Sequence, residues 1–249
     1  MDSGMLVVVL GLIVAGAVAQ RVAGLGFAML VSPFLVILLG PHTGVLLVNI
    51  CGVASSALIA PRVWRDIDWS TFRWLTVFSV AGSIPGAIAA TYLPSAALSI
   101  TVGSVVLTAL ILSLALNRAN VVVRGNGPKA VAGALSGLTN AMAGVGGPAV
   151  SAYAVLSRWE QRPFAATLQP FFVLMGSVAI AVKAIVDPGQ IPMLDPWAWV
   201  LILAAIIVGI FGGEMLQRHI RDRHARAFVI FIAFVGSVAA LVKGLLDLA

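Results

Sequence analysis

The chain has 249 residues, of which 61% are hydrophobic and only 10% are charged. Soluble domains contain roughly 45–50% apolar and about 25% charged residues, so this composition excludes a water-soluble fold and indicates a protein whose exterior faces lipid. The net charge of +6 predicts no nucleic-acid partner, because the basic residues lie in short connectors between apolar runs, as in the cytoplasmic loops of membrane proteins.

Ten apolar runs follow one another along the chain. They cover about 5–19, 25–39, 43–60, 72–92, 97–116, 129–142, 148–157, 164–186, 197–216 and 226–246. A membrane helix needs about 20 apolar residues, so the sequence predicts an all-α integral membrane protein with eight to ten helical segments. The first run lacks a preceding basic region, and we therefore interpret it as a membrane segment and not as a signal peptide.

The connectors between the runs differ in charge. Those at 62–73, 117–129 and 217–226 are rich in Arg and Lys, which predicts that they face the cytoplasm. The connectors at 92–97 and 186–196 carry no basic residue and are predicted to lie outside. Both termini are then periplasmic in an inner membrane, and the segment pairs at 5–39 and 129–157 enter the membrane from opposite faces.

Glycine-rich motifs interrupt both of these pairs. The motif Ala-Gly-Leu-Gly occupies 23–26, and Ala-Gly-Val-Gly-Gly-Pro occupies 143–148. Gly24 and Gly26 lie 120 residues before Gly144 and Gly146. We therefore expect two inverted-topology repeats, each a broken helix pair followed by three spans: residues 1–118 and 129–249, joined by a cytoplasmic linker at 119–128. In such transporters the substrate site lies near the midplane, where the broken helices meet.

The two interruptions predict an anion site. A helix that restarts after Gly26 or at Gly147 and Pro148 presents free N–H groups and the positive end of its dipole, which attract anions. The alternative is that the glycines only permit close helix packing. Their pairing in the two halves favours the anion site, because a helix break in lipid is tolerated only where protein or a water-filled cavity satisfies the freed backbone groups.

Polar side chains near the interruptions extend this site. The 120-residue offset also places Gln20 on Asn140 and Asn49 on Gln169, and these amides either line a polar path or form interhelical hydrogen bonds. Arg21 is either a countercharge for the anion or a side chain that reaches the interface. The predicted substrate-binding residues are Gln20, Arg21, Gly24, Gly26, Ser32, Asn49, Asn140, Gly144, Gly146, Gly147, Pro148 and Gln169.

The remaining polar residues suggest no catalytic role. Lys183 and Glu214 are expected to be interfacial anchors, and His42 a solvated loop residue. Thr139 and Ser151 either donate to the site or bond to their own helices. The sequence contains no enzyme motif, no carboxylate in the middle of a span and no metal-ligand cluster, so it predicts no enzyme activity, metal or cofactor. An inside-negative potential drives anion export by roughly 2.3 kcal/mol per charge per 100 mV.

These motifs resemble the sulfite exporter TauE/SafE family of membrane proteins. The resemblance rests on the two glycine motifs, with Ser-Pro at 32–33 after the first, on the loop Arg-Val-Trp-Arg-Asp-Ile-Asp-Trp at 62–69, and on Gly82 and Gly86. It implies export of sulfite, sulfoacetate or a related organosulfur anion. The chain departs from the family pattern at Phe27 and Ala28, where another glycine is common.

The sequence therefore favours a membrane transporter that exports a small anion. Two alternative functions remain, and each predicts a different flux. A passive anion channel would show flux that does not saturate with substrate. A membrane assembly or sensor subunit would show no flux. The expected partners are the anion and the lipid bilayer, and a homo-oligomer is compatible with the sequence.

Overall fold

The computed structural model describes residues 3–23, 26–116, 122–192, 194–217 and 222–248. Throughout these ranges the regular structure is helical, which confirms the predicted all-α class. The α-helices are α1 (Ser3–Ala23), α2 (Phe27–Leu39), α3 (Pro41–Val63), α4 (Trp69–Tyr92), α5 (Ser95–Leu116), α6 (Asn126–Ala143), α7 (Gly147–Ser157), α8 (Gln161–Val186), α9 (Pro196–Gln217) and α10 (Asp222–Leu246). Two short 3-10 helices, η1 (Trp64–Asp66) and η2 (Pro188–Gln190), lie in connectors.

The ten α-helices differ in length and apolar character. Among the described residues, seven helices are long and apolar enough to cross a membrane: α1, α3, α4, α5, α8, α9 and α10. Helix α6 has 18 residues but is not among these seven. Helices α2 and α7 have 13 and 11 residues, or roughly 20 and 16 Å at about 1.5 Å per residue, so they are too short for a hydrocarbon core of about 30 Å. The molecule is a multi-pass membrane protein that contains two short helices.

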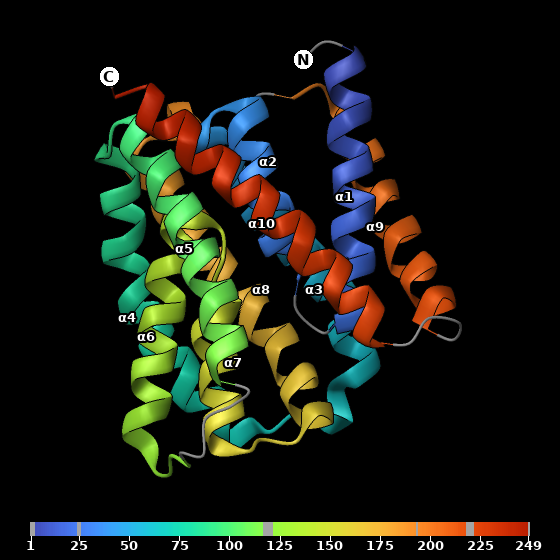
Figure 1. Cartoon of the computed structure of the whole chain (residues 1–249), viewed down its shortest axis with the longest axis vertical. Coiled ribbons are helices and arrows are strands. Elements are labelled where there is room, and N and C mark those ends of the chain that lie inside the picture. Colours follow the sequence, from blue (N-terminus) through green and yellow to red (C-terminus); the bar gives the residue numbers. More distant parts are fainter. Residues whose placement is uncertain (1–2, 24–25, 117–121, 193, 218–221, 249) are drawn as a thin grey trace.

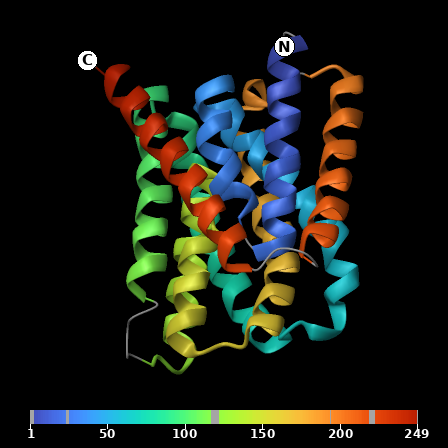
Figure 2. The ribbon, with the colours of Figure 1, turned by 45° about the vertical axis from the view of Figure 1, so that its right-hand side comes forward.

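The connectors gather at two ends of the bundle (Figures 1 and 2). At the lower end, Arg162 at the start of α8 pairs with Asp66 in η1 at 3.0 Å, and the Val123 N–H donates to the Leu156 carbonyl of α7 at 2.9 Å. At the upper end, Gln190 of η2 donates to the Thr91 carbonyl at the end of α4. The basic connectors that the structure describes thus share one end; residues 218–221 of the third lie outside the described ranges.

Glycines bring α4 against α6 and α1 against α9. At each contact, an added side chain would lie against a backbone carbonyl of the neighbouring helix. The four contacts join Gly82 to Ala134, Gly86 to Leu138, Gly209 to Val14, and Gly213 to Val18. Small residues allow this approach of helix backbones, which increases van der Waals contact between membrane helices.

Helices α3 and α8 pack against each other between these two pairs, running in opposite directions (Figure 2). Gly176 of α8 faces α3: a Cβ there would lie 2.6 Å from Val53 Cγ2 and 3.6 Å from the Asn49 carbonyl oxygen. Helix α8 remains continuous through Pro170. The facing surfaces of α3 and α8 form one wall of the site described next.

Candidate functional site

Both glycine motifs interrupt the helical path. Helix α1 ends at Ala23, and α2 begins at Phe27 after Gly26, which has a φ of 153°. Helix α6 ends at Ala143, and Gly144 follows it in a left-handed conformation with a φ of 72°. These two φ angles favour glycine, because it lacks the Cβ that disfavours such conformations. Gly24, a predicted site residue, lies outside the described residues.

The restarted helices present uncapped N-termini. Gly26 and Gly146 occupy the N-cap positions of α2 and α7, and neither helix receives a side-chain cap there. Pro148 is the second residue of α7. The first N–H groups of any helix lack acceptors within that helix, so both N-termini offer hydrogen-bond donors.

A cavity of about 50 Å³ lies between these N-termini. Since one water needs roughly 10–15 Å³ measured in this way, the cavity has room for a few waters or a compact anion. It is lined by Gln20, Gly26, Phe27, Ala28, Met29, Val48, Asn49, Gly52, Val53, Ser56, Asn140, Gly144, Val145, Gly146, Gly147, Phe172 and Gly176. Among the described residues, the lining contains both uncapped N-termini and no Arg, Lys, Asp or Glu.

The four predicted amides form two contacts across the halves of the chain. Asn140 Nδ2 donates to Asn49 Oδ1 at 2.6 Å, and Gln20 Nε2 donates to Gln169 Oε1 at 3.3 Å. All four side chains are buried. The 120-residue offset converts one contact into the other, because it places Gln20 on Asn140 and Asn49 on Gln169.

Each amide contact is completed by further hydrogen bonds. Asn49 Nδ2 donates to the Val45 carbonyl at 3.0 Å. Gln20 Nε2 also donates to Ser56 Oγ at 2.9 Å, and Gln20 Oε1 accepts from Ser55 Oγ at 3.0 Å. These bonds fix the orientation of the amides at the cavity wall.

Some predicted site residues lie beside the cavity and not in its wall. Ser32 Oγ donates to the Ala143 carbonyl at 2.5 Å, which joins α2 to the end of α6. Gln169 is not among the described lining residues, and its Oε1 accepts from Gln20, which lines the cavity. Thr139 Oγ1 donates to the Leu135 carbonyl and Ser151 Oγ to the Gly147 carbonyl, so both hydroxyls bond to their own helices.

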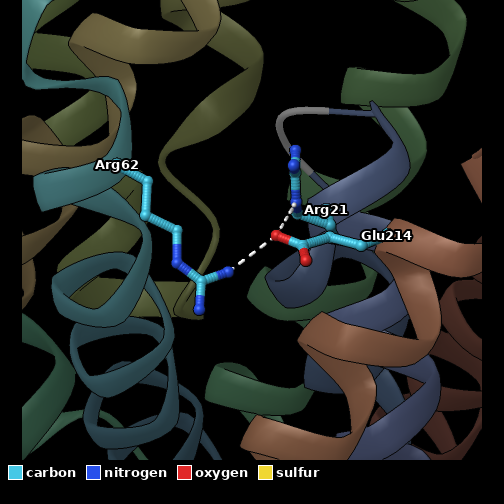
Figure 3. Close-up of polar contacts among 3 residues, drawn as sticks. All are labelled: Arg21, Arg62 and Glu214. Carbon is cyan, nitrogen blue, oxygen red and sulfur yellow. Dashed lines mark hydrogen bonds and ion pairs between the residues drawn. The ribbon is translucent and has the colours of Figure 1, made fainter.

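Arg21 also lies outside the cavity wall. Its Nε is 3.2 Å from Glu214 Oε1, and Arg62 Nη1 is 2.6 Å from the same oxygen (Figure 3). The guanidinium of Arg62 also lies 5.3 Å from the centre of the Phe211 ring. Glu214, whose side chain is 29% exposed, thus joins α1, α3 and α9 in a cluster of two arginines and one carboxylate.

Two expectations for ionisable residues were wrong. Lys183 is not an interfacial anchor, because its side chain is 1% exposed and Nζ has no hydrogen-bond partner. His42 is not in a solvated loop; it lies in the first turn of α3, and its Nδ1 is buried without a partner. Sequence reasoning also missed Ser56, although it follows Asn49 by seven residues and so shares its helix face.

Comparison with protein families shows to which family the chain belongs. The family described as Sulfite exporter TauE/SafE matches residues 8–240. The chain belongs to this family. No curated protein and no solved structure matches it. Members of the TauE/SafE family are membrane transporters of sulfur anions and not enzymes, which agrees with the seven long apolar helices. Phe27 and Ala28, which follow the first glycine motif, both line the cavity.

Proposed function

We propose that this TauE/SafE protein exports sulfite or an organosulfur anion across the inner membrane and binds it in the cavity between α2 and α7. The observation that carries the proposal is the lining of that cavity. It includes the uncapped N-termini of two short helices and contains no charged side chain. Backbone N–H groups at helix N-termini are suited to compact oxyanions.

The cavity supplies neutral donors of two kinds. The first turns of α2 and α7 supply backbone N–H groups, and Gly26 and Gly146, at the N-caps of these helices, both line the cavity. Asn140 supplies a side-chain amide that donates one hydrogen bond within the described part of the protein, to Asn49. The N–H groups of Gln20 and Asn49 already donate to protein acceptors, so these amides contribute polar wall and orientation. A transported ion must bind strongly enough to enter and weakly enough to leave, and neutral donors meet this requirement better than a buried arginine would.

Equivalent contacts in the two halves support the inverted repeat that this mechanism needs. Val14 and Val18 lie 120 residues before Ala134 and Leu138, and each pair receives a pair of glycines from another helix. We infer that residues 1–118 and 129–249 are inverted repeats joined by the linker at 119–128, with both termini periplasmic. In such transporters, alternating access results from rocking of one repeat or bundle against the other around a fixed site.

Flux in proteoliposomes tests the proposal. The purified protein is offered sulfite, thiosulfate, sulfoacetate, sulfate and small carboxylates, each over a range of concentrations. We expect saturable flux of at least one sulfur anion, and loss of that flux on Gly146→Val. Flux that rises linearly with concentration would indicate a channel. A protein that moves none of these anions would contradict the proposal and favour the assembly or sensor subunit.

A further inference from the structure

Polar residues continue from the cavity along the interface between α3 and α8. On α3, His42, Asn49 and Ser56 are spaced by seven residues, and seven-residue spacing returns to one helix face. On α8, Gln169 and Lys183 lie seven residues on either side of Gly176. Because the helices run in opposite directions, these residues pair at three heights along the interface. Asn49 and Gly176 lie at the height of the cavity. Ser56 and Gln169 lie one step lower, and His42 and Lys183 one step higher.

The contacts agree with this register. Gly176 faces Asn49 and Val53. Ser56 and Gln169 are joined through Gln20, whose Nε2 donates to both. At the upper level, His42 lies within electrostatic range of Lys183 and of the Asp187 carboxylate. It also hydrogen-bonds to the Gln190 side chain and to the Leu93 backbone. The Lys183 side chain starts toward the cavity, since Cα–Cβ bonds tilt toward the N-terminus of a helix.

Among the residues that the structure describes, Lys183 has no hydrogen-bond partner at this position. It is 99% buried, yet its Nζ makes no hydrogen bond. The nearest acid in sequence, Asp187, accepts instead from the Gly189 N–H at 3.1 Å and from Gln190 Nε2 at 2.9 Å. Lys243, also near the upper end, differs: its Nζ donates to the Ile37 carbonyl at 3.0 Å.

An ammonium in this environment requires a counterion. Ionisable residues within membrane segments are costly, and they pair with other groups or mark an ion pathway. A buried charge without a partner is destabilising, so a bound anion that supplies the partner gains affinity from the same interaction. His42 Nδ1 has no hydrogen-bond partner among the described residues, so an Nδ1–H group would offer the anion a second donor near the ammonium.

We propose that Lys183 and His42 form a second anion site, above the central cavity, which the sulfur oxyanion occupies on its way to the periplasm. The inference rests on the proposed function for its direction and for its substrate. The site takes the same chemical class as the cavity, but it holds the anion by a fixed positive charge. The anion passes from neutral donors at the cavity to the ammonium two helical turns higher, about 10 Å along α8.

Calorimetric titration of the purified protein with sulfite tests the site by stoichiometry. We expect two bound anions in the wild type, one in Lys183→Met and one in Gly146→Val. Lys183→Arg should retain both anions, and Lys243→Met, which removes the same charge near the same end of the bundle, should also retain both. Removal of an unpartnered buried charge should not lower the melting temperature of Lys183→Met, so the comparison is made on folded protein.

Flux gives an independent readout. Sulfite flux in proteoliposomes should fall at least about tenfold in Lys183→Met, the loss expected for one charge-assisted hydrogen bond, and should stay near the wild-type value in Lys243→Met. If Lys183→Met retains both bound anions, or transports as Lys243→Met does, the second site is wrong. If Gly146→Val still binds two anions while Lys183→Met binds one, the proposed anion site in the central cavity is wrong and the Lys183 site stands.

Discussion

Gly146→Val distinguishes a backbone anion site from an arginine pocket. Gly146 has a φ of −97°, which any residue adopts, so the substitution changes space and not backbone preference. A Cβ there would lie 2.9 Å from Asn140 Cβ and from Met175 Sδ, and closer still to Met175 Cε. Valine would therefore force Met175 and Asn140 to shift, and Asn140 lines the cavity of about 50 Å³ at the N-terminus of α7.

The expected losses can be compared. Excluding an anion from two N–H donors removes about 1.5–3 kcal/mol for each hydrogen bond to a charged group, so affinity should fall at least about a hundredfold. Arg21→Gln instead removes one charge outside the cavity wall and leaves Glu214 paired with Arg62. At a separation on the order of 10 Å this costs about 0.4–1.7 kcal/mol, or roughly two- to twentyfold, and salt reduces the difference.

Calorimetry at low and at moderate salt measures the sulfite affinity of the Gly146→Val and Arg21→Gln variants, and so gives both affinity losses. Gly11→Val is the matched control, because a Cβ at Gly11 meets no atom within 4 Å. It should bind as the wild type does. Thermal melting of each purified variant confirms that it is folded. The backbone site would be refuted by near-native affinity in Gly146→Val together with loss of binding in Arg21→Gln.

Three further outcomes are expected. Single cysteines placed at 62–73 or 122–129 should resist an impermeant thiol reagent in intact cells, and rapid labelling there would overturn the topology. Asn49→Leu leaves Asn140 Nδ2 without its acceptor; stability should fall by about 0.6–2 kcal/mol, and flux by a larger factor than the melting curve explains. Gly137→Leu should lower the free energy of unfolding by the roughly 1–3 kcal/mol typical of overpacking, and with it the melting temperature, because a Cβ at Gly137 overlaps the Ser79 carbonyl. An unchanged melting curve would contradict the close packing of α4 on α6.

The positions of helices and interruptions were predictable because they depend on local patterns. Apolar length fixed the long helices, and glycine motifs located the ends of α1 and α6 to within a few residues. The ends of α3 were predicted less accurately, because the helix extends over Pro41–Val63 and the apolar run covers only 43–60. Pro at the first helical position and polar residues in the last turn are compatible with a helix but carry no apolar signal.

The surroundings of the charged residues were not predictable in the same way. Arg21 is close in sequence to the first interruption, which suggested a role in the cavity. In the structure Arg21 instead forms an ion pair with Glu214, almost two hundred residues later in the chain. Such a pairing depends on which helices become neighbours, here α1 and α9. Local sequence gives no information on that choice, whereas the glycines that allow it are visible only once the partner helix is known.

The burial of Lys183 has a similar origin, yet one signal was available. A lysine three residues before the end of a long apolar run normally extends toward the interface. Its seven-residue relation to Gln169, however, places it on the amide-bearing face of α8, which packs on α3. His42, Asn49 and Ser56 show the matching spacing on α3. Two antiparallel helices with polar residues at the same seven-residue spacing align these residues level by level. This spacing would have indicated a polar interface that continues beyond the cavity toward the outer end, but our predictions from the sequence did not use it.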